Sequence, residues 1–418
     1  MEIMKKVWIV NYYANIPEKV GNPRHYEFAK YLTERGYSVR VFFADKKRVP
    51  DEGAAIRKGQ KYICEKHEGI TYTRIAAIPY GENNIKRGIS IWKFAWRILM
   101  LRRKFERPDV ILFNIHAPFD YPIVWCAQRL KSKLITEAWD LWPDSFVRFG
   151  LMSASSPVVK FFYHVERKMY EHGDRIIFTF EGGVDYLKDR GWLAGNGGKI
   201  PKDKIAYINN GVNLDTFTQF RKDYPTHDQD LLREDIIKVV YLGSIRLVNH
   251  VKELIDAAEI LKDNDKIKFI LIGDGPDRPA LERHCIDNNL RDVLFKQRHV
   301  PFCEVADIVS HASINVMNYQ KDFGIYGVSS GKFSQYLAAG QPILCNIKLN
   351  YCEITRNNIG IAEDLNTPQK YADAILKLTH LTASEVDSMR SRIKTTAQKF
   401  DYPVLSAKLE ALIISVLS

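Results

Sequence analysis

The chain has 418 residues, a mass of 48.3 kDa and a composition that is 46% hydrophobic, 12% aromatic and 27% charged. This composition excludes a disordered chain or a small disulfide-stapled scaffold, and the length predicts two or three domains. The 61 Lys and Arg residues exceed the 50 Asp and Glu residues, and the formal charge of +11 favours anionic partners such as nucleotide phosphates, acidic lipid or nucleic acid.

The cysteines and the N-terminal segment indicate the compartment. The six cysteines form no CxxC pair, and most lie in apolar surroundings that are typical of buried thiols in a reducing cytoplasm. The apolar run 7–10 is too short for a signal peptide, and no stretch approaches the roughly 20 apolar residues that span a bilayer. We therefore expect a cytoplasmic protein that meets a membrane, if at all, from its surface.

Strand-like and helix-like segments alternate in the first half of the chain. Short β-branched or aromatic runs are separated by longer helical patterns, which is the signature of βαβ units and a parallel sheet. The segment 24–35 places Phe28 and Leu32 on one helical face and ends at Gly36, a favoured helix stop. The strands that this half predicts are 7–10, 38–43, 110–113, 133–136, 175–178 and 205–208.

The same alternation returns in the second half after a polar interruption. Residues 213–234 contain Pro225 and several Asp residues and show no clear apolar periodicity, so we expect a linker there. Apolar residues at helical spacing over 405–417 predict a closing helix. The strands predicted between these two segments are 238–242, 268–272, 293–296, 313–316 and 342–346.

The predicted fold class is α/β, with two Rossmann-like, doubly wound parallel-sheet domains that face each other across a cleft. We assign residues 1–210 to the N-terminal domain, residues 211–236 to the linker and residues 237–398 to the C-terminal domain. Residues 399–418 are expected to form a C-terminal helix that packs back toward the N-terminal domain.

Open parallel sheets bind ligands beyond the carboxyl ends of their strands, so the residues that follow each strand are the first candidates. In the first half these include a loop with Gly21 and Arg24, and His116, whose imidazole can hydrogen-bond a substrate hydroxyl or carbonyl. Glu137 and Asp140 lie among tryptophans, which suits a polar, ring-shaped ligand such as a sugar. An ordinary βα loop, a structural histidine and a helix-capping carboxylate stay open as alternatives.

Glycine-rich and basic residues also follow the strands of the second half. Gly243 opens a turn that carries Ser244 and Arg246, with Lys252 further along the chain. Arginine combined with lysine is a common pairing for a diphosphate. Gly273 opens a second strand-to-loop switch.

A third loop in this half has the features of a phosphate cradle. The small-residue loop 326–331 and Lys332 run into a predicted helix over 333–339. Such a loop binds phosphate through backbone N–H groups and the helix dipole, and the lysine adds a full charge. The chain has neither a GxGxxG dinucleotide fingerprint after the first strand nor the GxxxxGK[ST] spacing of a simple ATPase.

The segment 326–342, together with 140–143, 210–217, 243–246 and 272–276, resembles the bacterial GT-B glycosyltransferases of family 4. It is most similar to the branch that builds O-antigen, capsule and other surface polysaccharides. The resemblance implies a retaining hexosyl- or N-acetylhexosaminyltransferase that takes a sugar from a nucleotide diphosphate, usually UDP, and it implies no cofactor and no metal ligand. It places the donor on the second domain and the acceptor on the first.

Several residues take their expected roles from this resemblance. His116 matches a histidine that contacts the donor sugar near the reacting carbon, and Arg246 matches a residue that holds the diphosphate and stabilises the departing charge. Gly21 and Arg24 match the loop that closes over donor and acceptor, and Arg298 lies where the base pocket is expected. The expected catalytic set is His116, Arg246 and Lys332; the acceptor side carries Glu137 and Asp140; and the donor-binding set is Gly21, Arg24, Ser244, Lys252, Gly273, Arg298, Tyr326, Gly327, Val328, Ser329, Ser330, Gly331 and Gln335.

Two features depart from the family pattern. Many members carry a Glu-x7-Glu pair, but the corresponding positions here are Gly327 and Gln335. Gln335 has one acceptor oxygen and holds ribose hydroxyls less strongly than a carboxylate does. The common Gly-Arg and Lys-Gly pattern appears here as Ser244 and Asn249, which is why we assign the phosphate role to Arg246. A weakened or inactive enzyme stays an open alternative.

The segment 86–107 carries eight basic residues against one glutamate. Lys93 and Arg97 share one helical face while Trp92 and Trp96 gather elsewhere, which suits an interfacial helix on anionic lipid. A domain helix with a solvated basic side and a buried aromatic side explains the pattern equally well. We expect peripheral association with the inner face of the cell membrane, where a polyprenyl-diphosphate-linked acceptor would be presented. No helix-turn-helix, zinc or RNP motif supports nucleic-acid binding.

These features predict a cytoplasmic, membrane-associated, retaining glycosyltransferase. The donor would be a UDP-sugar such as UDP-HexNAc, and the acceptor a lipid-linked glycan of bacterial surface-polysaccharide biosynthesis. Two alternatives stay open, a sugar-nucleotide 2-epimerase of GT-B fold and a non-catalytic partner that binds nucleotide or lipid in an assembly complex. The sequence does not specify the donor sugar, the acceptor, the linkage or the oligomeric state.

Overall fold

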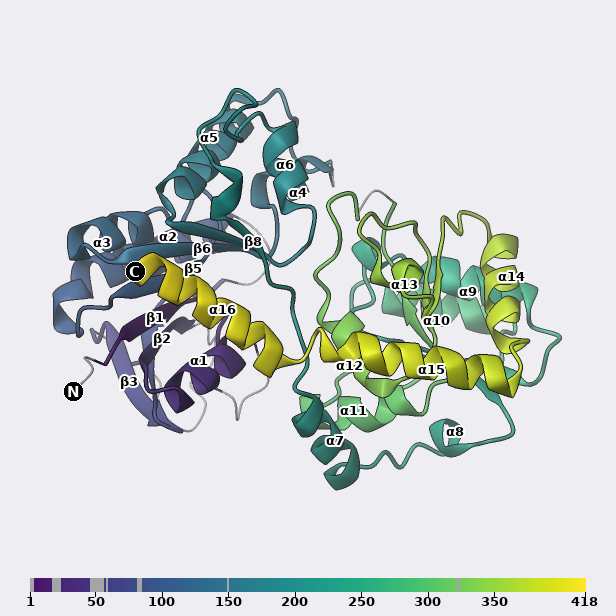
Figure 1. Ribbon diagram of the computed structural model, residues 1–418. Coiled ribbons are helices and arrows are strands. Elements are labelled where there is room, and N and C mark those ends of the chain that lie inside the picture. Colours follow the sequence, from purple (N-terminus) through teal and green to yellow (C-terminus); the bar gives the residue numbers. More distant parts are fainter. Residues whose placement is uncertain are drawn as a thin grey trace. The chain divides into compact units, whose positions relative to one another are not determined.

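The computed structural model describes residues 4–16, 24–45, 56–57, 59–80, 85–148, 150–321 and 324–418. The chain divides into two compact units (Figure 1). Unit 1 comprises Met1–Asn209 and Leu405–Ser418, and unit 2 comprises Asn210–Val404. The C-terminal segment of the chain therefore returns to unit 1 after unit 2 is complete.

Unit 1 is built on a mixed sheet with the order β3-β4-β2-β1-β5-β6-β7-β8 in the described part of the chain. Its neighbouring strands run parallel except for the antiparallel pair β3 and β4. Every residue of β5 is buried, as expected for a strand covered on both faces of its sheet. The strands are β1 (Lys6–Val10), β2 (Ser38–Asp45), β3 (Tyr62–His67), β4 (Ile70–Ala76), β5 (Val110–Asn114), β6 (Lys133–Ala138), β7 (Arg175–Phe178) and β8 (Ile205–Tyr207).

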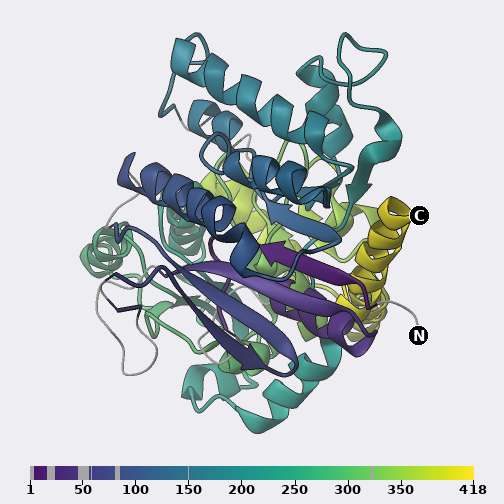
Figure 2. The same ribbon diagram turned by 90° about the vertical axis from the view of Figure 1, so that its left-hand side faces the viewer.

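Helices cover both faces of this sheet. Helix α1 and the C-terminal helix α16 lie on one side, where Arg35 and Glu410 form an ion pair at 3.4 Å, and α2 lies on the other side beside α3 (Figures 1 and 2). Among the buried side chains of α16, Leu405, Leu409 and Ile413 recur every fourth residue and form one helical face. The helices of this unit are α1 (Arg24–Glu34), α2 (Ile85–Leu101), α3 (Pro122–Leu130), α4 (Trp142–Arg148), α5 (Pro157–His172), α6 (Gly183–Asp189) and α16 (Tyr402–Leu417).

Unit 2 contains a parallel sheet with the order β11-β10-β9-β12-β13-β14. The strands are β9 (Ile237–Leu242), β10 (Ile267–Ile272), β11 (Val293–Phe295), β12 (Ile314–Met317), β13 (Ile343–Cys345) and β14 (Gly360–Ala362). The helices are α7 (Leu214–Asp223), α8 (Gln229–Leu232), α9 (Val251–Ile260), α10 (Arg278–Asp287), α11 (Phe302–Ser310), α12 (Gly331–Ala339), α13 (Glu353–Arg356), α14 (Pro368–Thr379) and α15 (Ala383–Gln398).

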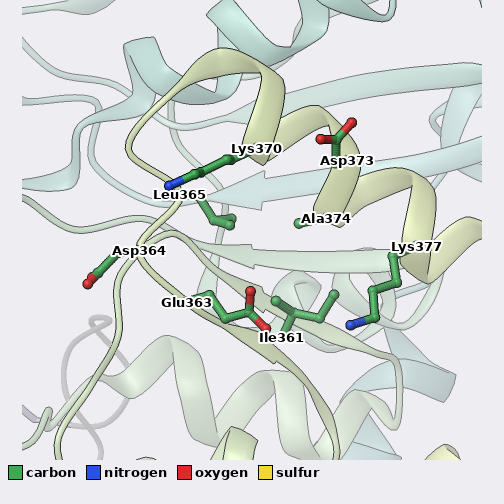
Figure 3. Close-up of a pocket in the computed structure, with 8 residues that line it drawn as sticks. All are labelled: Ile361, Glu363, Asp364, Leu365, Lys370, Asp373, Ala374 and Lys377. Atoms are coloured by element: carbon green, nitrogen blue, oxygen red, sulfur yellow. The ribbon is translucent and has the colours of Figure 1, made fainter.

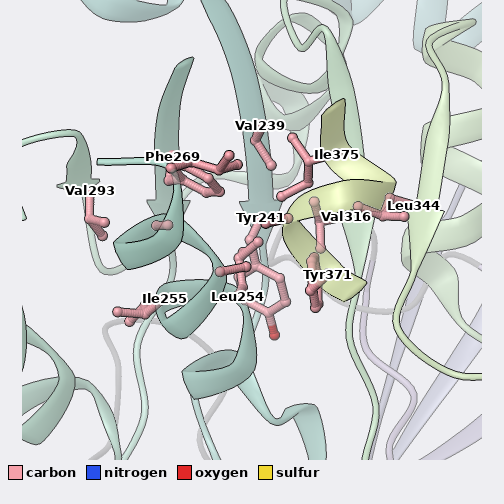
Figure 4. Packing of buried hydrophobic residues seen from close by; sticks show 14 of the residues in the cluster. Val239, Tyr241, Leu254, Ile255, Phe269, Val293, Val316, Leu344, Tyr371 and Ile375 are labelled. Carbon is pink, nitrogen blue, oxygen red and sulfur yellow. The ribbon is translucent and has the colours of Figure 1, made fainter. Parts of the chain in front are cut away.

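The main core of unit 2 lies between the sheet and two of its helices. Figure 4 shows Tyr241 of β9 and Phe269 of β10 together with Leu254 of α9 and Tyr371 of α14. Each of these four residues is at most 1% exposed to solvent. Their burial fixes the sheet from which the loops of the candidate site emerge.

The structure confirms the predicted parallel α/β architecture and adds three strands that the sequence patterns did not predict. Strands β3 and β4 form an antiparallel hairpin at Glu68 and Gly69, which both have positive φ. The residues of β3 are intermediate or exposed, so its apolar signal is weak. Strand β14 has three residues, too few for a pattern.

The segment that we predicted as a linker, residues 211–236, contains helices α7 and α8 of unit 2. Phe217 and Leu231 anchor these helices in the interior. The polar residues that suggested a linker include helix caps, since Asn213 accepts from the Thr216 N–H and Asp228 caps α8. One buried anchor per short helix does not produce a recognisable apolar period.

Candidate functional site

A pocket of about 250 Å³ lies in unit 1 beyond the carboxyl ends of β1, β5 and β6. This is the edge of the sheet at which the sequence predicted ligand contacts. Two residues of the predicted site, His116 and Asp140, line it. The remaining lining residues are Tyr13, Arg87, Asn114, Ile115, Trp139 and Trp142.

His116 is held in a defined orientation by Asp120. One carboxylate oxygen of Asp120 accepts the backbone N–H of His116 at 2.6 Å and lies 3.0 Å from the ring Nδ1. Both side chains are buried, and burial raises the pKa of the Asp120 carboxyl. The Nδ1–H tautomer of the imidazole donates to Asp120 and leaves Nε2 as the ring atom available to a ligand.

Aromatic rings surround the imidazole of His116. The rings of Tyr13 and Trp142 each lie 5.2 Å from it, measured between centroids. Arg87 of α2 donates from Nε to the hydroxyl of Tyr13, and its guanidinium lies 4.8 Å from the Trp142 ring. The pocket thus combines flat apolar walls with a cation and a ring nitrogen, a mixture that suits a polar, ring-shaped ligand.

Two of these residues were missed at the sequence level. Asp120 lies four residues after His116, and this spacing of a carboxylate from a histidine was a local signal that could have found it. Arg87 had no such signal, because in the sequence it is one of eight basic residues of segment 86–107. Its place in the pocket follows from the packing of α2, which local periodicity does not report.

Arg24 and Glu137 form a fully enclosed ion pair. The Arg24 guanidinium donates to Glu137 at 3.0 and 2.7 Å and to the carbonyl oxygens of Ile208 and Asn209. Trp139 donates to the other carboxylate oxygen of Glu137. Both side chains of the pair support the framework of unit 1, and their donor and acceptor contacts stay predictions. Gly21 lies outside the described residues.

The carboxylate of Asp144 anchors the helix that carries Trp142. Asp144 is buried and accepts hydrogen bonds from Arg148, Arg190 and the hydroxyl of Tyr163. Asp140, by contrast, is exposed at the rim of the pocket. Of the three acidic residues in the described segment 137–144, Asp140 is exposed, while Glu137 and Asp144 are buried and hydrogen-bond the aromatic side chains of Trp139 and Tyr163.

In unit 2, the loops after β9 and β10 approach each other closely. Gly273 has φ +138°, and a Cβ added there would lie 1.8 Å from the carbonyl oxygen of Gly243. Glycine is therefore required at position 273 for the two backbones to touch. Asn249 secures the first loop, since its amide donates to the carbonyl and hydroxyl oxygens of Ser244.

Lys332 stands in the first turn of α12, beside this loop pair. Its Nζ lies 4.6 Å from the Tyr241 ring centroid and 3.4 Å from the Tyr241 hydroxyl. A Cβ added to Gly243 would lie 3.0 Å from the same Nζ. Within the described residues no carboxylate pairs with Lys332. Desolvation, and next the charge of Arg246, lower the pKa of Lys332 to about 8.

The neighbouring groups make this corner of unit 2 an anion-seeking region. Arg246 is exposed and repels Lys332 electrostatically. Helix α12 begins at Gly331, and its N-cap residue Ser330 makes no side-chain capping hydrogen bond. The positive end of the α12 dipole therefore lies beside two positively charged side chains, Lys332 and Arg246. A dianionic group bound there would offset the electrostatic repulsion among these three positive charges.

The remaining predicted donor-binding residues divide into two groups. Tyr326, Gly327, Val328 and Ser329 belong to the loop before α12, in which Ser329 accepts from the Asn210 amide at 2.9 Å, and Gly331 and Gln335 lie on α12 itself. Gly327 has φ +90°, so this loop is built around glycine at the position where many family members carry glutamate.

The other two basic residues of the predicted set are engaged with carboxylates. Lys252 bonds both oxygens of Asp256, one turn along α9, at 2.7 Å. Arg298 pairs with Asp274 at 2.7 Å, next to the loop that begins at Gly273. Arg298 therefore lies at the carboxyl end of the sheet, beside Asp274. Lys252 is paired with Asp256 along its own helix.

A second pocket, of about 350 Å³, lies beyond β14 against α14 in unit 2 (Figure 3). Its charged side chains have both signs, and it includes none of the predicted site residues. Among the residues that the structure describes, no group of three or more His, Cys, Asp or Glu side chains is placed to hold a metal ion. Metal independence stays an expectation from the sequence resemblance.

Two family models match consecutive parts of the chain. The model for Glycosyltransferase Family 4 matches residues 24–216, and the model for Glycosyl transferases group 1 matches residues 224–400. No curated protein matches the sequence.

Solved structures share the fold over almost the entire chain. Sucrose-phosphate synthase from Thermosynechococcus elongatus is 17% identical with a TM-score of 0.70, and 99% of each chain is covered. The E. coli trehalose-6-phosphate structure with bound UDP-2-fluoro glucose is 10% identical with a TM-score of 0.72, again with 99% of each chain covered. Anabaena Alr3699/HepE in complex with UDP and glucose is 14% identical with a TM-score of 0.65, and 98% of this chain and 100% of that chain are covered. At these identities the likeness establishes a common fold.

Proposed function

Since this chain is a glycosyltransferase of GT-B fold, with a family 4 domain followed by a group 1 domain, we propose that it transfers a sugar from a UDP-sugar with retention of anomeric configuration. The proposed donor class is UDP-hexose or UDP-N-acetylhexosamine. The proposed acceptor is a lipid-linked glycan of the kind used for O-antigen or capsule. The protein would meet this acceptor at the inner face of the cell membrane.

One observation carries the donor assignment. Lys332 and Arg246 are neighbouring cations beside the start of α12, and no carboxylate of the described residues neutralises Lys332. Such an arrangement is costly in the empty protein and becomes favourable when a diphosphate binds. The UDP-2-fluoro glucose bound in the E. coli structure and the UDP bound in the Anabaena structure, both of the same fold, further support a uridine nucleotide.

The same two cations suit the chemical step. The bond between the sugar C1 and the β-phosphate oxygen breaks with its electron pair on the phosphate, and the acceptor oxygen bonds to C1 on the face that UDP leaves. The departing phosphate takes the proton of the acceptor hydroxyl, so no protein nucleophile is required. Arg246 and Lys332 stabilise the charge that develops on the phosphate.

The pocket of unit 1 supplies the sugar contacts in this proposal. Its aromatic walls, Tyr13 and Trp142, pack against the apolar face of a sugar ring. His116 presents Nε2 as a hydrogen-bond acceptor for a sugar hydroxyl, because Nδ1 donates to Asp120. Asp140 at the rim offers carboxylate oxygens to acceptor hydroxyls.

The experiment is a transfer assay with a panel of UDP-, GDP-, ADP- and dTDP-sugars, with a polyprenyl-diphosphate glycan or a soluble sugar phosphate as acceptor. We expect UDP and a lengthened lipid-linked glycan to appear together, and only when the lipid-linked acceptor is present. Transfer to the soluble sugar phosphate alone would contradict the acceptor assignment. Transfer from another nucleotide would contradict the donor assignment.

A second candidate is a non-catalytic nucleotide-binding partner, because Gly327 and Gln335 replace the usual glutamates. It predicts UDP binding without product on any acceptor. A GT-B 2-epimerase is distinguished in the same assay, since it would release UDP or convert the sugar nucleotide without any acceptor.

A further inference from the structure

Helix α2 exposes a line of apolar side chains to solvent. Ile85, Ile89, Trp92, Trp96 and Met100 follow one another at intervals of three or four residues, which places them on one face of the helix. Trp96 is partly buried and the other four are exposed. The opposite face already buries an apolar set that includes Phe94 and Ile98. The four exposed side chains of this line therefore lie outside the core of unit 1.

Tryptophans of two helices join in this surface. The rings of Trp92 and Trp96 stack at 5.5 Å with an interplanar angle of 14°, and Trp125 of α3 meets Trp96 edge-on at 6.4 Å. Trp92 is 45% exposed and Trp125 is 39% exposed. We call Ile85, Ile89, Trp92, Trp96, Met100 and Trp125 the tryptophan surface. Tryptophan is enriched where proteins contact the interfacial layer of a bilayer.

Cations lie next to the tryptophan surface in the chain. Arg103 and Lys104 belong to the 3-10 turn Arg102–Lys104 that directly follows α2, and Arg129 lies one turn after Trp125 on α3. All three of these basic side chains are exposed. Glu106, the one acidic residue of segment 86–107, is paired with Lys6 at 2.6 Å. The charge beside the tryptophan surface is thus positive and complementary to anionic lipid.

The structure corrects the basic face that the sequence predicted for this segment. Arg97 turns inward and donates to the carbonyl oxygen of Ala76, and burial lowers the pKa of Arg97. Arg87 also turns inward, to Tyr13. The aromatic side of the helix, which a purely structural role would bury, is the exposed one. No helix of the described residues is long and apolar enough to cross a membrane.

We propose that the tryptophan surface inserts into the interfacial layer of an anionic bilayer, with Arg103, Lys104 and Arg129 bound to lipid head groups. The first turn of α2 connects this surface to the pocket of unit 1. Arg87 lines the pocket, and Gly88 lies against Phe119, whose ring is 6.2 Å from that of Trp142. Docking would therefore hold the pocket near the head groups, where a lipid-linked acceptor is presented; this last step rests on the proposed function.

The test is sedimentation of the full-length protein with vesicles of phosphatidylcholine, with and without phosphatidylglycerol, in the absence of sugar nucleotides. The wild type should bind the anionic vesicles, and brominated lipid should quench its tryptophan fluorescence. The double variant W92S/W125S should lose at least about tenfold in partitioning. The variant R103Q/K104Q/R129Q should lose binding to anionic vesicles, by about fivefold for each charge.

A matched control removes two exposed apolar side chains of unit 2. In Y224S/I286S the replaced residues are 45% and 77% exposed, and this variant should bind vesicles like the wild type. UDP binding should be the same in every variant. Vesicle binding by a folded W92S/W125S variant at the wild-type level, or no binding by the wild type, would overturn the proposal. So would a wild-type dimer that W92S/W125S makes monomeric, since a second copy would then cover the surface. Failure of UDP binding would contradict the proposed function and leave the lipid result standing.

Discussion

Replacement of Lys332 by methionine should make the protein more stable and at the same time unable to hold a nucleotide diphosphate. The structure places this cation beside an aromatic ring and a second cation, with no carboxylate partner among the described residues. Methionine keeps a long, unbranched side chain in the same space. The substitution therefore removes the charge with little change in packing.

The magnitude follows from the pKa of Lys332, which falls from 10.5 to about 8 in the folded protein. That fall corresponds to about 3 kcal/mol of unfavourable free energy for the charged form. Because Lys332 is only partly buried and methionine loses the contact with the Tyr241 ring, we expect a net gain of about 1–3 kcal/mol at pH 7, or about 2–10 °C in Tm.

The pH dependence has a definite sign. A lysine whose folded pKa is lowered costs stability at every pH below about 8, and the cost disappears as the pH rises from about 8 toward the unfolded value of 10.5. The gain of the variant over the wild type should therefore be full at pH 7 and shrink above pH 8. Thermal unfolding at pH 7, 8, 9 and 10 measures this difference directly.

The assay combines these melting curves with titration of UDP. UDP should stabilise the wild type and have little effect on K332M. The control is K262M, because Lys262 is exposed and lies before β10, at the opposite edge of the sheet. That variant should melt and bind UDP like the wild type. If K332M were less stable than the wild type at pH 7, or bound UDP equally well, the argument from the uncompensated cation would be refuted.

Three further substitutions test unit 1. D120N removes the carboxylate that orients His116, so we expect kcat/KM to fall about tenfold, or by about 1.4 kcal/mol, while UDP affinity stays the same. ¹⁵N spectra of the imidazole should show a changed tautomer, and an unchanged tautomer would contradict this. Burial raises the pKa of Glu166 to about 7, so the wild type loses stability as the pH rises from 4.5 to about 7 and Glu166 ionises. E166Q lacks this loss, so in urea unfolding its stability relative to the wild type should be up to about 3 kcal/mol higher at pH 8 than at pH 4.5; the same pH dependence in both proteins would contradict this. R24M leaves the Glu137 carboxylate buried without its partner and should lower the free energy of unfolding by about 3–5 kcal/mol. R24M/E137L should recover most of that loss and leave UDP affinity unchanged; equal instability of the single and double variants would contradict the framework role.

The strands of both sheets could be predicted from the sequence because their burial appears as continuous apolar runs. Residues 110–113 and 175–178 are examples, and the structure places strands there. The half-exposed strand β3 and the three-residue strand β14 leave no such run. The caps of α7 and α8 were mistaken for linker residues because capping side chains are the polar types that also fill linkers.

For the candidate site, local spacing located the loops but not the contacts within them. Arg24 and Glu137 are separated by 113 positions, and their mutual burial depends on three elements coming together. Arg87 enters the pocket through the packing of α2 and not through any motif. Lys332 could be proposed from the sequence because a small-residue loop before a helix is a local feature. That no carboxylate of the described residues pairs with it is a property of the folded unit.

The measurement that tests the central claim most directly is the thermal stabilisation of the wild-type protein by UDP, compared with GDP, ADP and dTDP at equal concentrations. A ligand that binds only the folded state adds about 2.7 kcal/mol at one hundred times its Kd. We predict that UDP raises Tm, that the other nucleotides do so less, and that K332M abolishes the effect. Equal stabilisation by all four nucleotides, or by none, would contradict it.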